Sequence, residues 1–122
     1  MARFAEAEED LLAAQRLEPA NVDAQLNLGV VLSRKGRWRD ALPYLRRTVE
    51  LDTSQASAYF YLGEALNHVD DLEGALSSYQ RAVELRPNDS RALYGLGIVL
   101  DRMNRPDDAA QMYRRSRELI RQ

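Results

Sequence analysis

The segment from Tyr59 to Pro87, YFYLGEALNHVDDLEGALSSYQRAVELRP, carries the pattern that decides the fold. Its first half places four residues at the i, i+3, i+4 and i+7 spacing that forms one face of an α-helix: Tyr59, Leu62, Gly63 and Leu66. A second apolar stripe at helical spacing runs from Leu72 to Ala82. The segment therefore predicts two consecutive amphipathic helices.

A repeat of 34 residues extends this pattern along the chain. The Leu-Gly pair recurs at this step at Leu28-Gly29, Leu62-Gly63 and Leu96-Gly97. An alanine of the second helix keeps the same step at Ala41, Ala75 and Ala109. The sequence is therefore predicted to be all-α, with a half repeat over 1–21, which supplies a second helix only, followed by repeats over 22–55, 56–89 and 90–122.

Short breaks are expected between the two helices of each repeat. Gly36 and Asn104 are suited to end a helix in the left-handed conformation. Asp70 and Glu73 have the spacing of a capping box, and Pro43 is expected to kink the helix that contains it. A glycine within a helix costs roughly 1 kcal/mol relative to alanine, so the glycine of each Leu-Gly pair is predicted to allow two helices to pack closely.

These residues resemble the tetratricopeptide repeat family. Its signature is matched in the order aromatic, Leu-Gly, large apolar, alanine, aromatic and proline, here Tyr59, Leu62, Gly63, Leu66, Ala75, Tyr79 and Pro87. The resemblance covers the whole chain. It implies a single domain over 1–122 with about three and a half repeats, in which antiparallel helix pairs stack into a right-handed superhelical solenoid with a concave inner face.

Composition excludes several classes of function. The 122 residues have a net charge of −2, which argues against a general nucleic-acid binder. The chain has no cysteine and no run that approaches the ~20 apolar residues of a membrane-spanning helix. The N-terminus lacks the apolar core of a signal peptide. We therefore expect a cytoplasmic protein that has neither nucleic acid nor membrane as a partner.

The face of each first helix opposite the signature residues is the candidate binding surface. It carries more apolar and aromatic residues than a merely solvated face requires. The peptide-binding residues predicted on this face are Leu26, Asn27, Val30, Arg34, Phe60, Tyr61, Glu64, Asn67, Arg91, Tyr94 and Ile98. Alternatively, some of these side chains pack on neighbouring first helices and take no part in binding.

The polar residues of this face suggest how a peptide is held. Asn27 and Asn67 can bond donors and acceptors of a peptide backbone, and Arg34, Arg91 and Arg102 can hold a carboxylate.

Two binding modes of the family lack their residues here. The carboxylate clamp of the chaperone-binding members falls on Leu26, Val30, Tyr61, Arg91 and Gly95, of which only Arg91 is chemically close. The asparagine ladder of the sugar-transferase members is also absent. An acidic C-terminus is therefore not the expected ligand.

No constellation in the sequence predicts catalysis, a metal or a cofactor. The only histidine, His68, is expected to be a solvated imidazole near a helix end, with Glu64 one turn earlier. No oriented nucleophile and no glycine-rich phosphate loop accompanies it. The chain is therefore predicted to be a protein–protein interaction module, an adaptor or scaffold that binds an apolar peptide or amphipathic helix of unknown identity.

Self-assembly is the alternative function. Residues 1–21 hold five acidic residues against two arginines, whereas residues 102–122 hold six arginines against three acidic residues. One acidic and one basic end favour weak head-to-tail stacking into a homo-oligomer. Favourable interactions with the helix dipoles explain the same charges without any assembly.

Overall fold

The computed structural model describes residues 21–121, and within this range every regular element is a helix. The helices are α2 (Val22–Arg34), α3 (Trp38–Leu51), α4 (Ala56–His68), α5 (Leu72–Leu85), α6 (Ser90–Arg102) and α7 (Pro106–Arg121). Corresponding helices begin 34 residues apart, at 22, 56 and 90 and at 38, 72 and 106. The predicted half repeat over 1–21 lies outside the described residues, except for its last residue.

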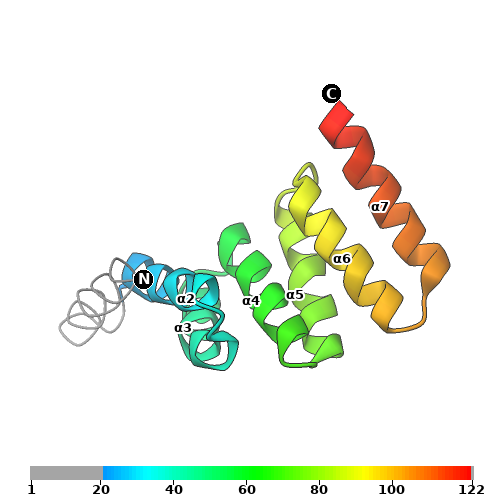
Figure 1. Ribbon diagram of the computed structural model, residues 1–122. Helices are drawn as coiled ribbons and strands as arrows, with labels where there is room; N and C mark the ends of the chain where they lie inside the picture. The colour runs from blue at the N-terminus through cyan, green and yellow to red at the C-terminus, as the bar shows by residue number, and fades with distance from the viewer. Residues whose placement is uncertain (1–20, 122) are drawn as a thin grey trace.

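The helices form antiparallel pairs, α2 with α3, α4 with α5 and α6 with α7, which stack in chain order (Figure 1). Packing is densest within each pair, less dense between a second helix and the next first helix, and slight between successive first helices. The prediction of an all-α superhelical solenoid built from helix pairs is confirmed. The first helices α2, α4 and α6 are therefore neighbours along one side of the stack.

The glycines of the Leu-Gly pairs lie where two helices meet. A Cβ atom added to Gly29 would lie 2.5 Å from Cδ2 of Leu45. One added to Gly63 would lie 2.9 Å from Cγ of Tyr79. One at Gly97 would lie 2.6 Å from Cε1 of Tyr113. Each distance is too short for a real carbon contact, so the predicted close approach within each pair is confirmed.

The turns within the repeats correct one predicted cap. Gly36 and Asn104 have φ of 75° and 59°, as expected of left-handed helix stops. Asp70 takes the equivalent position, with φ 66°, so it does not cap the next helix. Asp71 is the cap, and its Oδ1 accepts a hydrogen bond from the main-chain N of Gly74 at 3.0 Å. The predicted capping box of Asp70 and Glu73 is therefore wrong, because the cap is Asp71, one residue later.

Candidate functional site

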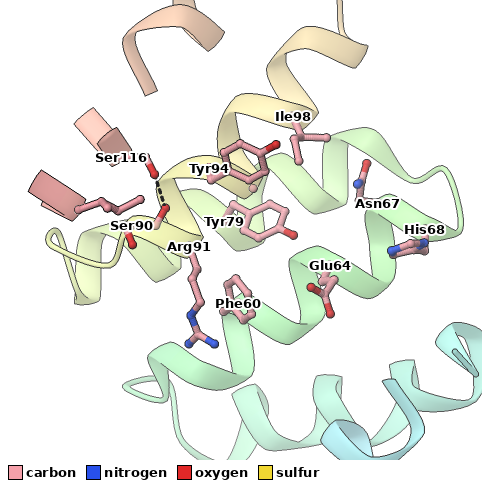
Figure 2. A pocket seen from close by; sticks show the side chains of 12 residues that line it. Phe60, Glu64, Asn67, His68, Tyr79, Ser90, Arg91, Tyr94, Ile98 and Ser116 are labelled. Atoms are coloured by element: carbon pink, nitrogen blue, oxygen red, sulfur yellow. Dashed lines mark hydrogen bonds between the residues drawn. The ribbon is translucent and has the colours of Figure 1, made fainter. Parts of the chain in front are cut away.

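A cavity of about 460 Å³ lies on the α4 and α6 side of the second and third repeats. Residues of four helices line it: Phe60, Glu64, Asn67, His68, Tyr79, Ser90, Arg91, Tyr94, Gly95, Ile98, Ser116 and Ile120 (Figure 2). Six of the predicted binding residues are thereby brought together, all of them from α4 and α6. The cavity is the candidate site for a ligand.

Aromatic and aliphatic side chains form most of its walls. Tyr94 is 55 % exposed and Ile120 is 72 % exposed, so the Tyr94 ring and the Ile120 methyl groups are accessible at the rim. Phe60 is only 8 % exposed and packs edge-on against Tyr79, with ring centroids 6.0 Å apart. Phe60 is therefore buried mainly against the second helix of its own pair and also borders the cavity, and its predicted part in binding stays a prediction. An apolar wall with an open rim suits the side chains of a bound peptide.

Glu64 places a carboxyl group in this apolar setting. It is half-buried and, within residues 21–121, makes no hydrogen bond or ion pair. Burial raises the pKa of Glu64 above its ordinary value, and the charges of His68 and Arg91 partly oppose that shift. Burial and the nearby Glu64 charge together raise the pKa of the Tyr79 hydroxyl, which therefore stays protonated. The cavity thus combines an acidic group with a neutral hydroxyl.

Arg91 and Arg102 are held by the protein itself. The Arg91 guanidinium lies 4.7 Å from the centre of the Phe60 ring, and its Nε is 3.8 Å from Oδ1 of Asp89. Nη1 of Arg102 donates to the main-chain O and to Oδ1 of Asn67, at 2.7 and 2.6 Å. Nη2 of Arg102 donates to Oδ1 of Asp70 at 2.5 Å. The Arg102 side chain therefore links two repeats, and its predicted role in holding a ligand carboxylate stays a prediction.

The remaining predicted residues do not line the cavity. Leu26, Asn27, Val30 and Arg34 lie on α2 in the first described repeat, where Asn27 and Arg34 are exposed and Leu26 packs partly on the core. Tyr61 is half-buried and meets Phe60 edge-on, with ring centroids 5.2 Å apart. If these residues bind a ligand, they do so along a continuation of the inner face outside the cavity.

His68 stands at the end of α4, where it was expected, but its ring is not merely solvated. It stacks on the indole of Trp38 from α3, with ring centroids 3.9 Å apart and an angle of 3° between the planes. The two residues are thirty positions apart, so no local spacing predicts the contact. The stack joins the second helix of one repeat to the first helix of the next.

Sequence reasoning also missed cavity residues that it had assigned to packing or not considered. Tyr79 is a signature residue of the repeat, yet it also lines the cavity. A Cβ at Gly95 would lie 2.6 Å from Cε1 of Tyr79, so glycine leaves room for this ring. Ser116 donates from Oγ to the main-chain O of Ser90 at 2.8 Å and fixes α7 beside α6. The sequence signal for this cavity was Gly95 itself, a glycine at the position that Tyr61 takes one repeat earlier.

Neither a metal site nor a membrane span was found in the part of the chain that the structure describes. No group of three or more His, Cys, Asp or Glu side chains within residues 21–121 is placed to hold a metal ion. Over the same residues, the helices are too short or too polar to cross a bilayer.

Family models identify the repeats independently. Models described as tetratricopeptide repeat match residues 54–122, residues 22–51 and residues 1–36. The first of these alone covers more than half of the chain. No curated protein matches the sequence significantly.

Solved structures of MamA are similar to the whole chain. A MamA crystal structure is 33 % identical, with a TM-score of 0.92 over 95 % of this chain and 68 % of that one. A second is 32 % identical, with a TM-score of 0.93 over 97 % and 64 %. MamA from Desulfovibrio magneticus RS-1, from residue 41 to its end, is 28 % identical, with a TM-score of 0.92 over 98 % and 68 %. This chain therefore spans about two thirds of the length of these structures.

The repeat length, the packed glycines, the stacked helix pairs and the matching models agree with one another. The fold is that of a protein-interaction or scaffold module. The chain belongs to the tetratricopeptide repeat family.

Proposed function

We propose that the chain is an adaptor that binds a short apolar segment of a partner protein, as an amphipathic helix or an extended peptide, and that it has no catalytic role. The observation that carries this proposal is the cavity between α4, α6 and α7, with Tyr94 exposed at its rim. An exposed aromatic ring beside an apolar hollow supplies contact area at low entropic cost, which is typical of interface hot spots.

The neighbours of Tyr94 hold its exposed ring in position for binding. Its ring leans on that of Tyr113, with centroids 5.4 Å apart, and Tyr113 in turn donates from its hydroxyl to Oδ2 of Asp101 at 2.9 Å. Gly95 and Ile98 continue the surface along α6. The Tyr94 ring is therefore already positioned by Tyr113, and little conformational entropy of this side chain is lost when a ligand covers it.

Selection of a random dodecapeptide phage library on the intact chain tests the proposal. The enriched peptides are expected to carry apolar residues and to bind with affinities of about micromolar, as is usual for small transient interfaces. Tyr94→Ala should weaken the best peptide at least about tenfold, because it removes an exposed anchor. Gln80→Ala, an exposed change on α5 away from the cavity, should leave binding unchanged. Binding that resists Tyr94→Ala but is lost on α3 or α5 changes would refute the proposal.

Head-to-tail self-assembly remains the second candidate. The arginine-rich end of the chain and the exposed Ile120 on α7 favour it. Light scattering at high protein concentration and low salt would then detect oligomers that dissociate as salt is added. A strict monomer under those conditions would remove this alternative.

A further inference from the structure

Glu64 is an acidic residue of the cavity wall that makes no hydrogen bond or ion pair with any residue that the structure describes. Its side chain comes from the middle of α4 and lies between Phe60 and Asn67 along the cavity (Figure 2). A half-buried carboxylate loses part of its hydration, and an opposite charge would offset that loss. Within residues 21–121 no such charge is within ion-pairing distance of Glu64. The Glu64 carboxylate therefore has no direct ionic partner among these residues, although Arg91 and His68 line the same cavity and partly offset its burial.

The nearby cationic or titratable side chains are each committed elsewhere. Arg91 lies over the Phe60 ring, and Arg102 bonds to the preceding repeat. His68 is stacked on Trp38. Moving His68 or Arg102 to Glu64 would break a close contact between repeats. Arg91, whose side chain is mostly exposed, lies over Phe60 and makes no ion pair with Glu64. The Glu64 carboxylate is therefore open to a cation from outside.

The groups around Glu64 suit the rest of a basic side chain. Tyr79 is 3 % exposed, and its hydroxyl makes no hydrogen bond with any residue that the structure describes. Figure 2 shows its hydroxyl end directed toward the side of the cavity where Glu64 lies. A hydroxyl oxygen can accept a hydrogen bond from an ammonium or guanidinium group. The exposed ring of Tyr94 offers an apolar face along which an aliphatic stem can lie and a cation can be attracted.

We propose that the cavity binds a lysine or arginine side chain of the partner peptide, with its charged end at the Glu64 carboxylate and the Tyr79 hydroxyl. Apolar residues of the same peptide cover Tyr94 and Ile98. This inference rests on the proposed peptide-binding function and states which side chain specifies the ligand.

The phage selection described above also tests this inference, and its readout is the set of sequences of the enriched peptides. Peptides enriched on the wild-type chain are expected to share a lysine or arginine at one position next to apolar residues. The same library selected on Glu64→Gln should yield apolar peptides without that basic position. Selection on Glu73→Gln, which removes an exposed carboxylate from α5, should retain it.

A synthetic peptide measures the effect directly. Replacing its shared lysine by norleucine, or its arginine by citrulline, keeps the shape and removes the charge. This change is expected to weaken binding to the wild-type chain at least tenfold, and to weaken binding to Glu64→Gln much less, since truncating one partner of a buried charge pair is costly. Circular dichroism of both glutamine variants verifies that they are folded.

The outcomes separate the two proposals. Enriched apolar peptides with no shared basic residue, or equal binding of the charged and neutral peptides, would overturn the inference and leave the peptide-binding function standing. If no peptide is enriched on the wild-type chain relative to the Tyr94→Ala variant, both the peptide-binding function and this inference fail. A shared basic residue that is lost with Glu64→Gln and kept with Glu73→Gln supports both.

Discussion

At the scale of single residues, Tyr79 shows how the packing and the candidate site depend on each other. Its ring is confined by Gly63 of its own pair and by Gly95 of the next repeat, since a Cβ at either would lie within 3 Å of the ring. The sequence predicted Gly63 as a packing residue from its place in the repeat. It could not predict Gly95, because that contact depends on the angle at which successive pairs stack.

Gly63→Ala tests this confinement. Alanine would gain about 1 kcal/mol of helix propensity, but its Cβ would force the almost fully buried Tyr79 ring to move. We expect a net loss of about 1–3 kcal/mol in the free energy of unfolding, as is typical of overpacked cores, measured by chemical denaturation. Ser77→Ala, an exposed change on α5, should stay within about 0.5 kcal/mol of the wild type. A more stable Gly63→Ala variant would contradict the close packing.

The raised pKa of Glu64 predicts how the stability of the fold depends on pH. Burial raises its pKa in the folded state above its ordinary value of about 4.5, while His68 and Arg91 oppose the shift and the Tyr79 hydroxyl stays neutral. The folded state then binds the proton more tightly than the unfolded state, so stability falls as pH rises from about 4.5 through the raised pKa.

Thermal unfolding between pH 4 and pH 8 checks this sign. Glu64→Gln cannot ionise, so its Tm should exceed that of the wild type at neutral pH, and the gap should close in acid. Glu73→Gln provides the control for loss of an exposed charge. Parallel curves for the wild type and Glu64→Gln would mean that burial does not disfavour the carboxylate.

At the scale of elements, the repeat predicted which segments form helices, and the boundaries depend on single caps. Asp89 caps α6, and its Oδ1 accepts a hydrogen bond from the main-chain N of Arg91 at 3.0 Å. At the start of α5 the sequence predicted Asp70 as the cap, whereas the neighbouring Asp71 is the cap. Both residue types cap helices and tolerate the left-handed conformation, so the backbone of the turn decides.

Asp71→Ala tests the corrected cap. Removing the side chain that accepts from Gly74 should cost about 1 kcal/mol in the free energy of unfolding. Glu73→Ala should cost less, because Glu73 contributes to the first turn only through its charge. A larger loss for Glu73→Ala, measured by urea denaturation, would restore the capping box.

At the scale of the whole molecule, the cavity belongs to the stack and to no single repeat. Side chains from α4, α5, α6 and α7 surround it, so it exists only where two successive pairs are in place. Helical spacing predicted that Glu64, Tyr94 and Ile98 share an inner face. It could not predict that Phe60 turns into the core or that α2 lies outside the cavity, because these depend on how the pairs rotate against each other.

The most direct test of the central claim, that a peptide binds on the α4 and α6 side of the stack, is a map of amide chemical-shift changes. The ¹H–¹⁵N spectrum of the intact chain is recorded while the best phage-selected peptide is added. The largest changes are expected along α4 and α6, around Glu64, Tyr94 and Ile98, and at the end of α7. Changes confined to the outer surfaces of α3 and α5, with α4 and α6 unaffected, would contradict the account.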